Sequence, residues 1–375
     1  MKDIGIVVGK FAPVTRGHMN LINQTASECK HTVVVMSHHD GWLAEQNHRD
    51  QRVLTKKNRY RWLTQIFALR DDVTIVTLDE SDIARYPDGW SDWSQKLREL
   101  IAPVISELLR KRTCNTRDVY PDILDGAGLD ISFYSSEPGD VKGYKQHFPN
   151  WDVTLVDPTR GRYAISATMV RNNLYQYWNY LPTVVRQDYC LSVVVLGLES
   201  SGKTTLVRAL ASQYGTSWTE EYGRFYCLED LAGDESNLRS SDYPIIAYNH
   251  KVNELNDRKN ANQIWFGDTN AFVTEFFHRL YEGVPNPVVS AIAHSEHYDL
   301  VLVMPFDTPW VADGLRVNND RSITSKLWLE MAAEFPNQFP EGRTVYLKGK
   351  DYAERFKEAT DAVMDFMSKI ESGEI

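Results

Sequence analysis

The feature that most constrains the fold is a glycine-rich segment near the middle of the chain. The apolar, β-branched run at residues 193–196 predicts a buried strand. The pattern G-x-x-x-x-G-K-T then covers residues 197–204, and apolar residues at helical spacing follow until Gly215. A strand, a glycine-rich loop and a helix in this order are the setting that a phosphate-binding P-loop requires. The alternative, a glycine-rich turn with a surface lysine, does not demand this flanking pattern.

The residue types in this segment predict how it would bind ATP. Gly197 and Gly202 allow backbone angles that side chains disfavour, so that successive N–H groups can converge on phosphate oxygens. Lys203 would reach the β- and γ-phosphates, and the hydroxyl of Thr204 would bind Mg²⁺. The predicted ATP-binding residues are therefore Gly197, Ser200, Ser201, Gly202, Lys203, Thr204 and Thr205.

Composition narrows the classes of protein to which this chain can belong. Its 375 residues suit two domains better than one, and 42% hydrophobic with 25% charged residues are ordinary globular values. A net charge of −10 argues against a broad nucleic-acid or anionic-membrane surface. Anionic ligands must then be held by local devices such as loops, helix ends and single arginines.

The cysteines and the apolar runs indicate a cytoplasmic protein. The four cysteines are far apart and form no C-x-x-C pair, which is typical of reduced thiols. We see no secretory signal, and no apolar run approaches 18 residues, so we predict no membrane insertion.

Strands alternate with helical patterns on both sides of residue 185, which predicts two successive α/β domains with parallel sheets flanked by helices. The first is expected to be Rossmann-like and to span residues 1–183; the P-loop domain is expected to span 184–375. We also predict three helical features: one helix over residues 52–69, a helix broken at Pro103 and an aromatic-rich helix that opens near 165–171. Residues 110–130 are expected to be an insertion, and residues 182–188 a linker.

A first candidate site lies where the strand at residues 4–8 passes into a helix. The helix start carries Gly17 and His18, in a place where open α/β sheets bind phosphates. A lone histidine there is more often a cap or a core residue. A second helix start, I-S-A-T-M-V-R at residues 165–171, favours phosphate binding over a purely structural histidine, because it adds hydroxyls and an arginine.

Together these segments resemble the (H/T)-x-G-H and I-S-x-T-x-x-R motifs of the nucleotidyltransferase superfamily. The resemblance implies that His18 and Arg171 contact the triphosphate of ATP, helped by Thr15, Ser166 and Thr168. Gly9, Lys10, Phe11 and Gly17 would line the nucleotide cleft. Such transferases need no nucleophilic side chain, because the phosphate of the substrate attacks the α-phosphorus of ATP.

Trp90 and Trp93 lie in a stretch expected to be a glycine-containing loop. A surface hydrophobic cluster is one interpretation of the pair. The other is a binding site for a cationic nicotinamide ring, since a cation is attracted to the face of an indole.

The second candidate site combines the P-loop with residues further along the chain. Asp268 ends a predicted buried strand and could hold Mg²⁺ or accept a proton from an attacking hydroxyl; a helix cap is the alternative. Arg316 and Arg321 could close over the phosphates. The predicted acceptor-binding residues are Glu221, Tyr222, Arg224, Asp242 and Tyr243.

Taken together, G-L-E-S-S-G-K, E-Y-G-R, S-D-Y, D-T and W-V-A-D-G-L-R, following the first domain, resemble the NadR family. The resemblance implies a bifunctional enzyme: a ribosylnicotinamide kinase and a nicotinamide-nucleotide adenylyltransferase that use ATP and Mg²⁺ and release NAD. The chain departs from the family in three ways. It has no room for an N-terminal helix-turn-helix, which predicts no DNA binding, and it has Thr15 where relatives have His and Asn270 where they have a second acid.

Two other functions fit the same motifs. One is a sensor of NAD or ATP with reduced catalytic activity. The intact site residues argue against this alternative. The other is a nucleotidyltransferase for a different phosphorylated acceptor, for example one that makes a CDP-linked product. The sequence is compatible with a homo-oligomer.

Overall fold

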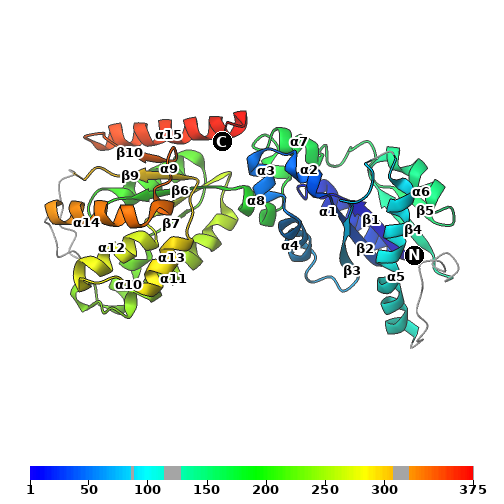
Figure 1. The fold of residues 1–375 in the computed structure, drawn as a ribbon, viewed down its shortest axis with the longest axis horizontal. Coiled ribbons are helices and arrows are strands. Elements are labelled where there is room, and N and C mark those ends of the chain that lie inside the picture. The colour runs from blue at the N-terminus through cyan, green and yellow to red at the C-terminus, as the bar shows by residue number, and fades with distance from the viewer. Residues whose placement is uncertain (86–87, 114–127, 307–320, 375) are drawn as a thin grey trace. The chain divides into compact units, whose positions relative to one another are not determined.

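The computed structural model describes residues 1–85, 88–113, 128–306 and 321–374. The chain divides into two compact units, Met1–Val185 and Arg186–Ile375. Each unit is described by itself below, and Figure 1 labels its helices and strands.

The first unit is built on a parallel sheet with the strand order β3-β2-β1-β4-β5. The order reverses at β1, whose two neighbours are β2 and β4, so the carboxyl end of β1 opens at the crevice where such sheets bind ligands. The strands are β1 (Lys2–Gly9), β2 (Cys29–His38), β3 (Val73–Asp79), β4 (Ile131–Ser135) and β5 (Asp152–Leu155).

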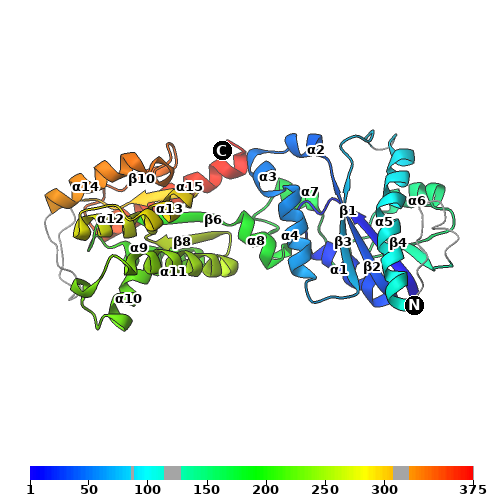
Figure 2. The same ribbon diagram turned by 60° about the horizontal axis from the view of Figure 1, so that its bottom comes forward.

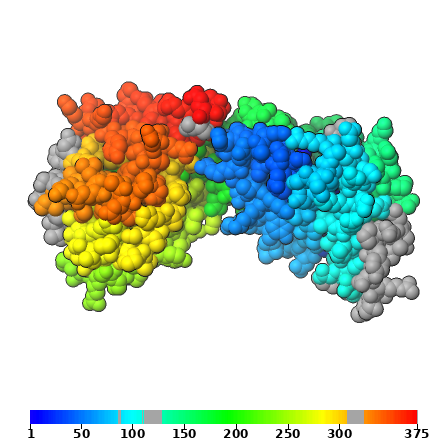
Figure 3. Space-filling view, viewed as in Figure 1, coloured from blue at the N-terminus to red at the C-terminus, as the bar shows by residue number. Residues whose placement is uncertain are grey.

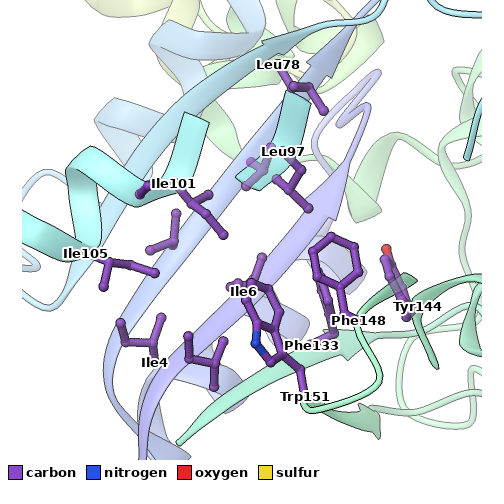
Figure 4. Packing of buried hydrophobic residues seen from close by; sticks show 14 residues of the cluster. Ile4, Ile6, Leu78, Leu97, Ile101, Ile105, Phe133, Tyr144, Phe148 and Trp151 are labelled. Carbon is purple, nitrogen blue, oxygen red and sulfur yellow. The ribbon is translucent and has the colours of Figure 1, made fainter. Parts of the chain in front are cut away.

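Helices cover both faces of this sheet, as Figure 2 shows. On one face, α5 and α6 bury a core that joins aliphatic residues of α5, such as Leu97 and Ile101, to Ile6 of β1 and to the aromatic residues Phe133 and Phe148 (Figure 4). The other face is covered by α1 and α4. The helices of this unit are α1 (Arg16–Glu28), α2 (Asp40–Ala44), α3 (His48–Val53), α4 (Lys56–Ile66), α5 (Trp90–Thr113), α6 (Val141–His147), α7 (Ala167–Asn172) and α8 (Thr183–Tyr189).

Two predictions about α5 were wrong. Trp90 and Trp93 lie in its first turn rather than in a loop, and their spacing of three residues puts them on one face of the helix. The helix also continues through Pro103. Pro103 is exposed, so the carbonyl that loses its partner can be solvated, while the apolar side of the helix on either side of Pro103 is buried against the sheet.

Three other local predictions were wrong. Residues 52–69 form parts of two helices, because Thr55 caps the start of α4 by accepting from the N–H of Asn58. The expected aromatic-rich helix is only the short α7, followed by a 3₁₀ turn at Trp178–Tyr180. The expected linker is the helix α8, in which Val185 is fully buried. The insertion expected at 110–130 lies mostly outside the described residues.

The second unit has a parallel sheet with the order β10-β9-β6-β8-β7. Its strands are β6 (Leu191–Leu196), β7 (Trp218–Thr219), β8 (Ile264–Asp268), β9 (Leu300–Val303) and β10 (Thr344–Tyr346). The helices are α9 (Lys203–Tyr214), α10 (Tyr222–Asp230), α11 (Asp242–Asp257), α12 (Ala271–Glu282), α13 (Pro287–Ser295), α14 (Arg321–Glu334) and α15 (Tyr352–Ser372). Figure 3 shows α14 in orange beside α12 and α13 in yellow on one face of this unit. The predicted fold class, two α/β units with parallel sheets, is confirmed.

Within the described residues, no helix combines the length and the apolar character needed to span a membrane.

Candidate active sites

The first site is organised by the loop between β1 and α1. Thr15 caps α1: its hydroxyl oxygen accepts from the N–H of His18 at 3.4 Å, and its own N–H donates to Nδ1 of His18 at 3.0 Å. The ring of His18 also meets the edge of Phe11, with the ring centres 5.1 Å apart. Thr15 is thus fully engaged in fixing the imidazole, rather than pointing a free hydroxyl at a ligand.

These contacts also fix the protonation of His18. A backbone N–H can only donate, so Nδ1 accepts and the neutral ring carries its proton on Nε2. Burial, with a smaller effect from Arg160, lowers the pKa of His18 to about 4. At neutral pH the ring is therefore an uncharged hydrogen-bond donor.

The second helix start of this site is α7. Ser166 caps it by accepting from the N–H of Met169 at 3.1 Å. Arg171 crosses to the β1–α1 loop, where one guanidinium nitrogen donates to the carbonyl of Ala12, and another donates to the hydroxyl of Thr168 at 3.0 Å. Arg171 of the second motif is therefore bonded directly to the loop that leads into the first motif.

Both helix starts open on one cavity of about 560 Å³. Its walls supply two arginines, a lysine, a neutral histidine donor and two helix N-termini, which can bind a polyanion, and also the carboxylates of Glu137, Asp140 and Asp157. All the residues predicted for the transferase nucleotide site line it: Gly9, Lys10, Phe11, Thr15, Gly17, His18, Ser166, Thr168 and Arg171.

The sequence interpretation missed several other residues of this cavity, among them Trp42 and Arg160. The indole of Trp42 on α2 lies against two cations, with Lys10 Nζ 5.7 Å and Arg171 Cζ 5.3 Å from the ring centre. Arg160 also lines the cavity and is paired with Glu137. For Trp42, the only signal in the sequence was its position just after the carboxyl end of β2. No feature of the sequence pointed to Arg160.

A second cavity, of about 430 Å³, adjoins the first and shares Gly9, Lys10, Trp42 and Asp140 with it. Both predicted nicotinamide-binding residues, Trp90 and Trp93, line it. Their rings meet edge to face at 5.2 Å, and Trp90 is parallel to His147 at 5.9 Å. Both tryptophans also pack on the α5–α6 core, so they combine a structural role with a place in the cavity wall.

Behind both cavities lies a fully buried cation, Arg59 of α4. Its guanidinium donates to the carbonyls of Lys10, Ser37 and Leu54 and contacts Nδ1 of His38 at 2.7 Å. Burial lowers the pKa of Arg59 to about 10, which leaves it charged at neutral pH. It ties the β1–α1 loop to the end of β2 and adds positive potential beneath the cavities.

The second site is the loop between β6 and α9. Gly197, Ser200 and Gly202 have φ values of 156°, 54° and 90°, and a Cβ at Gly197 would lie 2.7 Å from Cβ of Met304. Only glycine fits that approach. Lys203 is buried, and its Nζ donates to the carbonyl of Leu198 at 3.2 Å, so the ammonium is held within the loop.

Asp268 lies at the end of β8, which pairs directly with the P-loop strand, as predicted. Its Oδ2 accepts from the hydroxyl of Thr204, while its fully buried Oδ1 has no hydrogen-bond partner among the residues that the structure describes. Burial and then the nearby charge of Glu221 raise the pKa of Asp268 to about 6, against the opposing effect of Lys203. An orphaned carboxylate oxygen beside a threonine hydroxyl fits Mg²⁺, which prefers such oxygens together with water and phosphate.

Asn270 has a structural task at this edge of the sheet. Its side-chain oxygen caps α12 by accepting from the N–H of Val273 at 3.3 Å, and its amide nitrogen donates to Gln338 at 2.5 Å. A carboxylate could not make the second contact. The amide therefore suits this buried position, two residues from the acid of Asp268.

Three of the predicted acceptor residues, Glu221, Arg224 and Tyr243, line a narrow cavity of about 60 Å³ with Lys203. Tyr222 and Asp242 are not among its lining residues. The N–H of Tyr222 instead donates to His250, and Asp242 accepts from the N–H of Arg239 at 2.9 Å. The sequence interpretation missed Glu199, His250, Thr269 and Tyr281, which also line the cavity.

His250 connects this cavity to the end of β8. Its Nδ1 accepts from the N–H of Tyr222 at 3.4 Å, which leaves Nε2 to donate to the carbonyl of Thr269 at 3.2 Å. Burial lowers the pKa of His250, so the ring is neutral. Of the two predicted arginines, Arg316 lies outside the described residues, and Arg321 begins α14.

Each half of the chain matches a known protein family. Residues 6–173 match the family model described as cytidylyltransferase-like, and residues 192–344 match the one described as an AAA domain. The chain is 34% identical over 374 residues to the trifunctional NAD biosynthesis/regulator protein NadR of Escherichia coli (strain K12), covering 98% of this chain and 84% of that protein.

Two solved structures are also similar. One is a NadR protein in complex with NR, with 28% identity, a TM-score of 0.73 and coverage of 97% of this chain and 96% of the other. The second is NadR in complex with NAD and AMP-PNP, with the same identity and TM-score and coverage of 98% and 97%.

Proposed function

This chain belongs to the NadR family, and from that premise we propose that it catalyses two successive steps of NAD biosynthesis. Residues 184–375 phosphorylate ribosylnicotinamide with ATP, and residues 1–183 transfer the adenylyl group of a second ATP to the resulting mononucleotide. The products of the second step are NAD and pyrophosphate.

In the kinase step the 5′-hydroxyl of ribosylnicotinamide attacks the γ-phosphorus of ATP. The P-loop N–H groups and Lys203 hold the phosphates. Glu221, Arg224 and Tyr243 line the space next to Lys203, where the acceptor would lie. Since Oδ2 of Asp268 is already bonded to Thr204, we assign the proton of the acceptor hydroxyl to Glu221, which lines this cavity with Lys203, as do the carboxylates of Glu199 and Glu235.

Thr204 and Asp268 would hold Mg²⁺ in the kinase half, and the orphaned Oδ1 of Asp268 supports this assignment. Bound there, the ion neutralises phosphate charge. Asp268 must be ionised to bind it, which the raised pKa of this residue allows at neutral pH and above.

In the transfer step the phosphate of the mononucleotide attacks the α-phosphorus of ATP and pyrophosphate leaves. The ATP would occupy the cavity of His18 and Arg171, and the mononucleotide the adjoining cavity of Trp90 and Trp93. The shared wall at Gly9 and Lys10 would then lie next to the reacting phosphates. His18 Nε2–H and Arg171 stabilise the charge that develops on the triphosphate, which is the largest contribution that a site without a nucleophile can make.

The strongest support is the convergence of all the transferase residues predicted from two distant motifs on the walls of one cavity. We also propose a cytoplasmic location, which agrees with the reduced, buried thiols of Cys29, Cys190 and Cys227. The net charge of −10 gives no support to a DNA-binding role.

The test is to incubate the protein with ATP, Mg²⁺ and ribosylnicotinamide and to identify the products by mass spectrometry. The wild type should form the mononucleotide and then NAD. Lys203→Ala should abolish the first product yet convert added mononucleotide to NAD, whereas Arg171→Ala should stop at the mononucleotide. Lys357→Ala, which removes an exposed lysine of α15, is the matched control and should behave as the wild type. Loss of both activities in a folded Lys203→Ala would contradict the two-site assignment.

A further inference from the structure

The second of the two adjoining cavities of the first unit carries a carboxylate that the first does not, Glu80. The cavity of His18 and Arg171 is lined by the cations Lys10, Arg160 and Arg171 together with the carboxylates of Glu137, Asp140 and Asp157. The cavity of Trp90 and Trp93 is lined by the carboxylates of Glu80 and Asp140 and by Lys10, besides its aromatic rings. The arginine on its wall, Arg85, is paired with Glu45 at 2.7 Å. Next to Glu80, the second cavity therefore suits a cation or a hydrogen-bond donor.

Glu80 is held in a defined position in this second cavity. It follows β3 directly, and its N–H donates to the carbonyl of His38 at 2.7 Å. Its Oε1 accepts from the indole N–H of Trp93 at 2.9 Å, so the carboxylate is fixed at the edge of that ring. The side chain is half-buried, and burial raises its pKa. A ring stacked on the indole would therefore present its substituents to a partly desolvated carboxylate.

We propose that Glu80 is a specificity-determining residue that selects the carboxamide of nicotinamide mononucleotide over the carboxylate of its acid analogue. This inference rests on the proposed adenylyltransferase function. The amide N–H₂ can donate to the second oxygen of Glu80, and the cationic pyridinium is attracted to the same charge. The acid analogue places a carboxylate against a carboxylate, and like charges brought together without solvent disfavour binding.

The experiment compares kcat/KM of adenylyl transfer for the two mononucleotides at pH 8, well above the usual pKa range of a glutamate. The wild type should prefer the amide by ~10² or more, since sites built around a polar contact reject analogues that cannot make it. Glu80→Gln keeps the shape and an oxygen for Trp93 while its amide can donate to a carboxylate. This variant should lower the ratio of kcat/KM for the amide to kcat/KM for the acid at least ~10-fold, mainly because kcat/KM for the acid rises.

Two further variants separate charge from structure. Glu80→Asp keeps the negative charge and should retain most of the preference. Asp82→Asn removes an exposed acid two residues away, paired with Lys96, and should match the wild type. Phosphorylation of ribosylnicotinamide by each variant checks that the chain has folded.

An unchanged preference in Glu80→Gln, or a preference lost equally in Asp82→Asn, would overturn the proposal. Failure of the proposed function is distinguishable, because the wild type would then form no dinucleotide from either substrate. In that event calorimetric titration of both mononucleotides into the wild type and Glu80→Gln still tests Glu80. Equal affinities of the wild type for the two ligands would refute its role.

Discussion

Thr15 and His18 form a reciprocal pair at the start of α1. The threonine hydroxyl accepts from the backbone N–H of His18, and the threonine N–H donates to the imidazole of the same residue. Since Thr15 orients the ring that we propose to donate to the triphosphate, Thr15 belongs to the positioning machinery of that proposed site.

Replacement of Thr15 should therefore impair transfer less than replacement of His18. His18→Ala removes a donor to developing charge and should lower kcat for NAD formation by ~10²–10³. Thr15→Ala removes the cap, which stabilises by ~1 kcal/mol, and loosens the ring. It should lower kcat by ~10-fold, while Thr15→Ser should restore activity and melting temperature. Steady-state kinetics and thermal unfolding measure both effects; full activity of Thr15→Ala would contradict this role.

The pKa of His18 gives a spectroscopic prediction. Its folded pKa, about 4, is below the ordinary 6.5, so the unfolded chain binds the additional proton between these values. This residue should therefore make the protein less stable as the pH falls from 6.5 towards 4, and should contribute no change above 6.5. NMR of ¹⁵N-labelled histidine should show the Nε2–H tautomer across this range. A ring that titrates near 6.5 would refute the assigned hydrogen bonds.

Asp268 should behave in the opposite way. Its pKa is raised from 3.8 to about 6, so the folded state binds the proton more readily and this residue favours folding increasingly as the pH falls from 6 to 4. Kinase activity, which needs the carboxylate, should fall as the pH drops through about 6 at low Mg²⁺. Higher Mg²⁺ should move this limb to lower pH, because the cation competes with the proton. Transferase activity over the same pH range is the control. If the acidic limb of the kinase pH profile does not move with the Mg²⁺ concentration, Asp268 does not belong to the metal site.

The two cavities should respond differently to two tryptophan variants. Trp93→Leu removes an indole from the cavity assigned to the mononucleotide, and should raise KM for that substrate with little change for ATP. Trp42→Leu removes the ring against which Lys10 and Arg171 lie and, because Trp42 borders both cavities, should raise KM for ATP and for the mononucleotide. Each lost cation–π contact corresponds to ~1–2 kcal/mol, or roughly 5- to 30-fold. Equal effects on both substrates in both variants would refute the division.

Pro103 should be a site where stability can be gained. It removes one hydrogen bond inside α5 but is exposed, so its ring contributes little to the core. Pro103→Ala should raise the unfolding free energy of the first unit by ~1–3 kcal/mol. The increase should appear in thermal unfolding without a change in either activity. A lower melting temperature would mean that the proline ring packs favourably.

The sequence predicted the parts of the sites that depend on local backbone geometry. The P-loop and the helix start at Ser166 each follow from residue types at fixed spacing and lie where they were expected. The cap at Thr15 was not predicted, because Thr15 was expected to contact the triphosphate. Asp268 was also predictable, because it ends a buried strand and parallel strands bring their carboxyl ends together.

Contacts set by tertiary packing were not predictable in this way. Trp42 meets Lys10 and Arg171 only because three segments converge at the sheet edge, and Arg59 reaches the β1–α1 loop from a helix on one face of the sheet. Trp90 and Trp93 were expected in a loop because a glycine precedes them. Their burial against Tyr144 and Phe148 favours the helix instead.

The wall shared by the two cavities has a kinetic consequence. Gly9, Lys10, Trp42 and Asp140 border both spaces, so a dinucleotide made there fills both at once. The product then excludes either substrate, and its departure requires that contacts on both sides be released together. NAD should accordingly be a competitive inhibitor against both ATP and the mononucleotide, and the rate of its own synthesis should slow as it accumulates.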